Sequence, residues 1–351
     1  MTTKFTTISS HSQFQPLKEV MIGGVYPESF FDQFDNETQD IMCLINEYTQ
    51  GDLKQVKDIL EKFKVNVVEP EFTKIDDYLD FQGNLIRPPI TPCDYYIALD
   101  DTLYVIPQYE SGIDPFQHAI DSWTANNQKV VVLDRGKPDP MVWCSFASII
   151  RLGKDIIVDF DATDRTRKKY CTEYIEKLSK QYRVHASTTG DHLDSVFCPL
   201  RPGVVLSSHY HTNQELFTDW KVIQLPDTTS ANRSLLPEKA QWWLPGVDYM
   251  HYNKNVLDVA RSWLGQPNET VFDVNNLVIN ENHVIMSGCN DDTAKQLEQL
   301  GMTVHLVDLK TKFFWDAGLH CLTRDVYRSG DKDDYWPDRE NNGINWVKHW
   351  N

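Results

Sequence analysis

A thiol, an imidazole and several carboxylates, spread along the sequence, are the side chains best able to do covalent chemistry. Cys321 follows an Ala-Gly pair, which lets the backbone approach closely, and Arg324 is near enough in sequence to favour its thiolate. His192 and Asp194 are two residues apart, so a strand would place both on one face. On that face, one of the two side chains can transfer a proton while the other binds a cation. Asp94 follows three prolines that stiffen the approach to a strand.

Each of these residues also has a purely structural explanation. An isolated cysteine is usually a small buried hydrophobe, and short polar pairs or capping carboxylates are common where strands begin. A metal site is the competing chemical interpretation, because His209 and His211 are also two residues apart. We favour covalent catalysis, because the sequence offers a thiol and carboxylates without a compact ligand cluster. No metal and no cofactor are therefore expected.

The composition is that of an ordinary globular chain. Of the 351 residues, 41% are hydrophobic and 24% are charged, which excludes a disordered or collagen-like protein. The formal charge of −17 argues against nucleic acid or an anionic membrane as a partner. No stretch approaches the ~20 apolar residues of a spanning helix, and the first residues lack the apolar core of a secretory signal. Seven cysteines, an odd number with no CxxC pair, predict reduced thiols and a cytoplasmic location.

A strand–strand–helix–strand pattern recurs along the chain. Four copies are expected at 94–133, 145–186, 194–224 and 271–307. A fifth needs both ends of the chain, with strands at 321–327, 18–23 and 65–68 and an amphipathic helix at 52–63.

Because one such unit cannot bury both of its faces alone, the repetition predicts a radial arrangement about an axis, with a site where strand ends converge. An irregular α/β sandwich is the alternative. No linker divides the chain, so residues 1–351 are expected to form a single catalytic domain.

The segments that carry Cys321, His192 and Asp94, taken together and in their order, resemble the amidinotransferases of the glycine amidinotransferase family. Within them HxD precedes PGxVL, and GxHCxT precedes DV, which makes the histidine and cysteine segments fairly specific. The segments that match the family's opening strand, middle hairpin, histidine segment and nucleophile segment are 16–23, 150–156, 190–206 and 317–328. The resemblance implies an α/β fold, the pentein-like five-bladed propeller of pseudo-five-fold ββαβ units that guanidino-modifying enzymes share.

Carried over residue by residue, the resemblance gives each chemical group a role. The nucleophile falls on Cys321, the general acid/base on His192, and the guanidinium-binding carboxylates on Asp94 and Asp194. It implies transfer of the amidino group from arginine, or a related guanidino donor, to a primary amine through a covalent amidino-cysteine, with release of ornithine. Such an enzyme is a transferase of one-carbon groups and acts on small molecules. A homodimer is compatible with the resemblance.

Two serines stand where the family carries acids. The carboxylate that orients the histidine falls on Ser145 and a second aspartate on Ser148, and a serine hydroxyl stabilises an imidazolium less well than a carboxylate. Asp139, upstream, and Asp191, beside the histidine, are the candidates to substitute for the missing acid.

The residues expected at the far end of the substrate also differ. The family's carboxylate-binding arginine falls near His211, and a serine of the fourth unit falls near Asp273, which would prefer an ammonium group. We therefore expect an acceptor that carries a cation, such as a diamine. The alternatives are a deiminase- or dihydrolase-type hydrolase of the same superfamily and a non-catalytic binder of guanidino compounds.

Overall fold

The computed structural model describes residues 7–134, 145–159, 173, 175–187, 192–208, 214–225, 244–264 and 273–339. Within these ranges the strands form five separate three-stranded sheets, and none of the described sheets closes on itself. Every sheet combines one antiparallel pair of strands with a third strand that lies parallel to its middle strand. The α/β class and the repeating unit agree with the prediction.

The five sheets follow chain order except that one joins the two ends of the chain. Their strands are β15 (Thr323–Arg328), β1 (Leu17–Ile22) and β2 (Asn66–Val68); β3 (Tyr96–Leu99), β4 (Thr102–Val105) and β5 (Lys129–Val132); β6 (Ile149–Leu152), β7 (Asp155–Asp159) and β8 (Arg183–Ser187); β9 (Phe197–Arg201), β10 (Val204–Ser207) and β11 (Lys221–Gln224); and β12 (Leu277–Asn280), β13 (His283–Met286) and β14 (Thr303–Leu306). The first of these sheets is the unit that the sequence predicted from both termini.

Helices connect the second and third strands of most units. The described helices are α1 (Asn36–Lys62), α2 (Pro92–Tyr95), α3 (Gln117–Ala125), α6 (Tyr249–Ala260), α7 (Asp291–Gln299) and α8 (Lys312–Trp315), with short 3-10 turns that include η4 (Phe146–Ser148), η5 (Leu193–Ser195) and η6 (Gln214–Phe217). The helix expected between 213 and 219 is thus only a 3-10 turn. Of the helix expected at 164–180, residues 175–178 are helical and most of the remainder lies outside the described residues.

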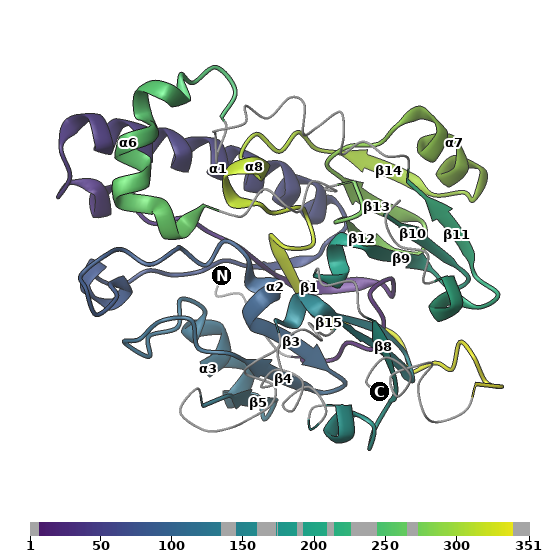
Figure 1. Cartoon of the computed structure of the whole chain (residues 1–351). Helices are drawn as coiled ribbons and strands as arrows, with labels where there is room; N and C mark the ends of the chain where they lie inside the picture. The colour runs from purple at the N-terminus through teal and green to yellow at the C-terminus, as the bar shows by residue number, and fades with distance from the viewer. Residues whose placement is uncertain are drawn as a thin grey trace, which may run out of the picture.

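Helix α1 starts far upstream of the predicted residue 52. Asp35 caps it by accepting the backbone N–H of Thr38 (3.0 Å), and its apolar stripe begins with Ile41 and Ile45. The helix continues through Gly51, because packing outweighs the cost of about 1 kcal/mol for a glycine in a helix interior. Figure 1 shows α6 beside it on one flank of the molecule, and the two helices are in contact. None of the described helices combines the length and apolar character that a bilayer crossing requires.

Strands β1 and β15 lie in the middle of the molecule, between the sheet of β3 and the sheets of β9 and β12 (Figure 1). Strand β15 carries Asp325, whose carboxylate binds Arg151 of β6 (2.5 and 2.7 Å), Arg328 Nε (2.6 Å) and Ser10 Oγ (2.9 Å). All three charged side chains are buried. Their mutual pairing satisfies charges that would otherwise be very costly in the interior.

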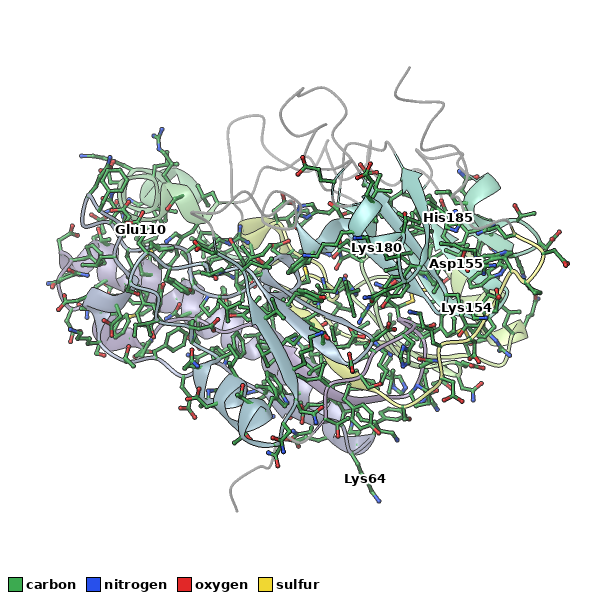
Figure 2. The ribbon with its side chains drawn as sticks, turned by 90° about the horizontal axis from the view of Figure 1, so that it is seen from below. Lys64, Glu110, Lys154, Asp155, Lys180 and His185 are labelled. Atoms are coloured by element: carbon green, nitrogen blue, oxygen red, sulfur yellow. The ribbon has the colours of Figure 1, made fainter. Side chains whose placement is uncertain are left out.

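A second buried charge group ties β7 to β8. Asp155 and His185 lie side by side in Figure 2, with Oδ1 and Nε2 separated by 2.6 Å, and Arg183 also binds Asp155. The hairpin before it turns at Gly153, whose φ of +64° suits glycine. A Cβ at this position would lie 2.0 Å from the carbonyl oxygen of Asp333, so the C-terminal segment docks there only because the residue is glycine.

Candidate active site

The chemistry-bearing residues share one position in the repeating unit: each lies just before the first strand of its sheet. Asp94 precedes β3, Ser145 precedes β6, Asp194 precedes β9, Asn275 precedes β12 and Cys321 precedes β15. A short helical turn holds Asp94 (α2) and Asp194 (η5), and Ser145 caps another such turn (η4). Equivalent positions from all five units therefore supply the site.

Asn275 holds the backbone and the sulfur of Cys321. Its Oδ1 accepts the backbone N–H groups of His320 (2.8 Å) and Cys321 (3.0 Å), and its Nδ2 lies 3.0 Å from Cys321 Sγ. Gly318 makes room for this contact, because a Cβ there would lie 2.5 Å from the Cβ of Asn275. The Ala-Gly pair before the thiol thus allows close approach, although the sequence did not identify Asn275 as the approaching residue.

Asp194 lies against the thiol of Cys321. Its Oδ2 is 3.4 Å from Cys321 Sγ and 2.9 Å from His320 Nδ1, and only 3% of the residue is exposed. Burial would raise the pKa of this carboxyl, but the hydrogen bond and charge of His320, together with His192 and Cys321, hold it below its usual value. Oδ1 has no hydrogen-bond partner among the described residues. An ionised carboxylate thus keeps one buried oxygen available to a ligand.

Cys93 is a second thiol in the same place. Its Sγ lies 3.8 Å from Asp194 Oδ2 and 3.8 Å from Asp94 Oδ1. The pKa of Cys93 is raised well above its ordinary value, first by complete burial and then by Cys321 and the two carboxylates. Nothing in the sequence indicates that Cys93 joins the site, except that it immediately precedes Asp94.

Asp94 and His192 form the more open side of the site. His192 Nδ1 is 3.7 Å from Asp94 Oδ1, and the side chains are 36% and 24% exposed respectively. Ser145 Oγ donates a hydrogen bond to the same Oδ1 at 3.1 Å. Ser145, which replaces the expected acid, therefore contacts a carboxylate that itself faces His192. Through Cys93 and Asp194 this side is continuous with Cys321.

Arg324 anchors the strand that follows the thiol. Its buried guanidinium donates to the backbone oxygens of Cys93 (2.6 Å) and Phe146 (3.2 Å), which links β15 to the segments that lead into β3 and β6. Its side chain is thus beneath the site rather than bound to Cys321, although its charge favours an anionic thiol at Cys93.

Of the remaining predicted residues, Ser148 and Asp273 are described, and no described side-chain contact links either of them to the groups above. The described contacts of Asp94 and His192 do not involve Ser148, which lies in the same turn as Ser145. Asp273 is in the turn before β12, where burial raises its pKa and Lys312 opposes that rise. A Cβ on Gly288 would lie 2.6 Å from its Oδ1. The positions outside the described residues are Asp139, Asp191, His209 and His211.

The assembled groups are two thiols, two imidazoles and two carboxylates at one partly open site. This set can bind a planar cation through the carboxylates, attack it with sulfur and exchange protons through an imidazole. A subset could also hold a metal, since ligand atoms of Cys93, Asp194 and His320 lie within 4.8 Å of one another.

Sequence comparison relates the chain to curated glycine amidinotransferases. The mitochondrial glycine amidinotransferase of Gallus gallus is 26% identical over 204 residues, which is 54% of this chain and 40% of that protein. The protein of the same name from Danio rerio is 24% identical over the same share of both chains. The chain thus matches less than half the length of these relatives. No protein-family model matches it.

Solved structures share the fold over nearly the whole chain. SxtG, an amidinotransferase of the saxitoxin biosynthetic pathway from Microseira wollei, has a TM-score of 0.66 at 15% identity and covers 94% of this chain and 99% of its own. The inosamine-phosphate amidinotransferase StrB1 from Streptomyces griseus gives 0.66 at 18%, covering 93% and 99%. A dimethylarginine dimethylaminohydrolase gives 0.53 at 14%, covering 88% and 99%. The curated relatives confirm the resemblance to amidinotransferases that the sequence motifs indicated, and the solved structures show that the fold is shared.

Proposed function

We propose that the chain is an amidinotransferase that moves an amidino group from arginine, or a related guanidino donor, to a primary amine through a covalent intermediate on Cys321. The observation that carries the proposal is the contact between the Cys321 thiol and Asp194. There, an ionised and buried carboxylate leaves one oxygen unpaired beside a nucleophile. A guanidinium supplies the planar N–H donors that such an oxygen needs.

In the first half of the reaction, Asp94 and Asp194 bind the guanidinium and fix its plane. The thiolate of Cys321 attacks the amidino carbon, and the bond from that carbon to the side-chain nitrogen of the donor breaks. His192 gives its proton to the departing nitrogen, which leaves as the amine of ornithine when arginine is the donor. Such a proton transfer contributes roughly 10²–10⁴-fold to the rate.

In the second half, the acceptor amine attacks the amidino-cysteine and the C–S bond breaks. His192 takes a proton from the attacking amine, so the enzyme returns to its starting protonation state. Water must be kept from the intermediate, because hydrolysis would release the group as urea. The burial of Cys321 and Asp194, which are 4% and 3% exposed, supports such protection.

Asp94 also takes over the task of the acid that Ser145 and Ser148 lack. Its Oδ1 faces the Nδ1 of His192 at 3.7 Å, and Ser145 donates to the same oxygen. A carboxylate at this distance favours the imidazolium that must protonate the leaving amine. A carboxylate, that of Asp94, therefore still orients His192, and the hydroxyl of Ser145 holds that carboxylate in position.

The acceptor is proposed to carry a second cationic group. Asp273 precedes the same strand as Asn275, and a carboxylate there attracts an ammonium and repels the carboxylate of an amino acid. His211, a second expected contact, lies outside the described residues. A diamine should therefore serve better than glycine.

Three further expectations belong to this proposal. The five units are arranged about one axis as a five-bladed propeller, residues 1–351 act as one catalytic domain, and a homodimer is compatible with both. The cytoplasmic location stays a prediction from cysteine usage, beside curated relatives whose names place them in mitochondria.

Arginine alone separates a transferase from a hydrolase. Incubation with arginine should give at most one ornithine per chain and add one amidino group to the intact protein. Sustained ornithine release should require an added amine, with a diamine faster than glycine. Sustained citrulline or urea production without an amine would replace the proposal with the hydrolase alternative.

The nucleophile is tested on two matched thiols. Cys321→Ala should abolish the mass adduct and turnover, whereas Cys43→Ala, on helix α1, should retain both. Tight arginine binding with neither adduct nor turnover in the unmodified protein would leave only the binder.

A further inference from the structure

Four donor atoms of different kinds converge beneath the opening of the site. From Asp194 Oδ2 the distances are 2.9 Å to His320 Nδ1, 3.4 Å to Cys321 Sγ and 3.8 Å to Cys93 Sγ. The ligand atoms of Cys93, Asp194 and His320 all lie within 4.8 Å of one another, and Cys321 meets this group through Asp194. We call these four residues the thiol cluster. Guanidino transfer uses Cys321 and Asp194 but gives no task to Cys93 or His320.

The separations of the other three donor atoms from Asp194 Oδ2 are close to those in a tetrahedral metal site. Zinc bonds of about 2.0–2.1 Å to nitrogen or oxygen and about 2.3 Å to sulfur separate the ligand atoms of a tetrahedron by roughly 3.3–3.8 Å. Two of the separations from Asp194 Oδ2, 3.4 and 3.8 Å, fall within this range. The third, 2.9 Å to His320, is a hydrogen bond that needs to open by only a few tenths of an ångström.

We propose that Cys93, Asp194, His320 and Cys321 form a binding site for one soft divalent cation, Zn²⁺ being the natural case, and that the bound ion occupies the groups on which the proposed transferase depends. Two thiolates select such an ion over Mg²⁺ or Ca²⁺, which prefer oxygen ligands. On binding, the ion displaces the two thiol protons to solvent. This consequence for activity rests on the proposed function, whereas the site itself does not.

A glutamine behind the cluster is placed to orient the histidine. Gln13 Nε2 lies 3.0 Å from His320 Nε2, and Gln13 Oε1 is buried without a partner among the described residues. A half-turn of the amide brings Oε1 to the Nε2–H of His320 and leaves Nδ1 as a lone-pair donor. Metal-bound histidines usually make such a second hydrogen bond through their other nitrogen.

The surrounding charge also suits a bound cation. Two thiolates and the carboxylate of Asp194 carry −3, so a divalent ion leaves −1. Arg324 supplies the balancing charge, because it is fully buried and bound to the carbonyl oxygen of Cys93. A net-neutral group of this kind avoids the large cost of an uncompensated buried charge.

Cobalt(II) tests the site without relying on activity. The full chain, stripped of metal by a chelator and kept reduced with a phosphine, is titrated with Co²⁺ while the absorption spectrum is recorded. We expect one equivalent to give the d–d bands of tetrahedral cobalt and a thiolate-to-cobalt charge-transfer band. Zn²⁺ should then bleach both.

Cys93→Ser is the decisive variant, because Cys93 has no part in the proposed transfer chemistry. It should lose about half of the charge-transfer intensity and weaken metal binding by at least about tenfold. Cys43→Ser, which changes a thiol on helix α1, should leave the spectrum unchanged. A thermal-unfolding curve like that of the unmodified chain shows that Cys93→Ser folds.

Two outcomes overturn the site: absence of a charge-transfer band, or a full-strength band in Cys93→Ser. Amine-dependent turnover of arginine in chelator, with no thiolate–cobalt band, removes the site and leaves the proposed function. The band without any turnover removes the proposed function and leaves the site. When both are present, one equivalent of Zn²⁺ should stop turnover, and chelator should restore it.

Discussion

Two buried aspartates, Asp325 and Asp194, meet opposite demands. Asp325 is held by Arg151, Arg328 and Ser10, so both of its oxygens have partners. Asp194 places three contacts on Oδ2 and leaves Oδ1 without a partner in the described chain. Each carboxyl is 3% exposed. The two carboxylates are equally buried but differ in their hydrogen-bond partners. The fully paired Asp325 stabilises the fold, whereas Asp194 keeps one oxygen that can bind a ligand.

The partners also differ in how they can respond. Arginines cannot give up their protons inside a protein, so Arg151 and Arg328 keep their charges and depend on the anion of Asp325. The neighbours of Asp194 are an imidazole and two thiols, which can become or remain neutral. The pKa of Asp325 is held well below normal by its arginines against the effect of burial, whereas Asp194 is lowered chiefly by His320. Because the imidazole and the thiols around Asp194 can be neutral, this site can bind or release a cation without leaving an unpaired buried charge.

Asp194→Asn should give the largest effect on function and little effect on the fold. Asparagine keeps the shape but loses the charge that binds the guanidinium, and losing one side of a buried charged pair costs about 2–5 kcal/mol. We expect kcat/KM for arginine to fall on the order of 10²–10³-fold, while the urea midpoint changes little because His320 can be neutral. Steady-state kinetics and urea unfolding measure the two. A large loss of stability with unchanged kinetics would reverse the assignment.

Asp325→Asn should show the reverse pattern. It leaves Arg151 and Arg328 buried without their anion, and the free energy of unfolding should drop by about 3–5 kcal/mol. Asp58→Asn removes only an exposed ion pair with Lys54, so it should change the free energy of unfolding by no more than about 0.5 kcal/mol. Denaturant unfolding of the unmodified chain, Asp325→Asn and Asp58→Asn measures these differences. Equal midpoints for both variants would show that the buried pairing contributes nothing.

The same comparison predicts a pH window. Because the folded-state pKa of Asp325 lies well below that of the unfolded chain, about 3.9, the unfolded state binds more protons as the pH falls below about 5. The stability from this carboxylate is fully present above that range and is lost as the pH falls towards its folded pKa. The difference in unfolding free energy between the unmodified chain and Asp325→Asn should therefore be constant near neutrality and shrink in acid. A difference that grows in acid would contradict the sign.

Much of this arrangement followed from the sequence alone. Alternating apolar runs and turn residues located the repeated units, including the sheet of β15, β1 and β2 made from both chain ends. The motifs singled out Asp94, His192, Asp194 and Cys321, and the structure brings these residues together. The length of α1 was wrong at its start, because tertiary packing carries the helix across Gly51 and local propensity does not show this.

The residues that the sequence missed are those whose roles depend on side-chain direction. Asn275 contacts Cys321 only because Gly318 removes a Cβ from its path, and Cys93 joins the site only because α2 turns it inward. One signal in the sequence points to Asn275: every other unit places a site residue just before its first strand, so the fourth predicted unit should do the same. The resemblance points to Asp273 in this segment, whereas Asn275 makes the contact.

Ser145→Ala gives the smallest and sharpest test, since it asks whether a hydroxyl matters through Asp94. Loss of one hydrogen bond to a carboxylate that is partly open to solvent should cost about 1 kcal/mol, a five- to tenfold drop in kcat/KM. The change also removes a cap from the turn of η4, because Ser145 Oγ accepts the N–H of Ala147, so stability alone cannot decide. Ser145→Thr retains the hydroxyl and should restore turnover, and Ser148→Ala, in the same turn, should leave it unchanged. If Ser145→Ala lowers stability but not kcat/KM, the serine only caps its turn, and Asp94 holds His192 without help.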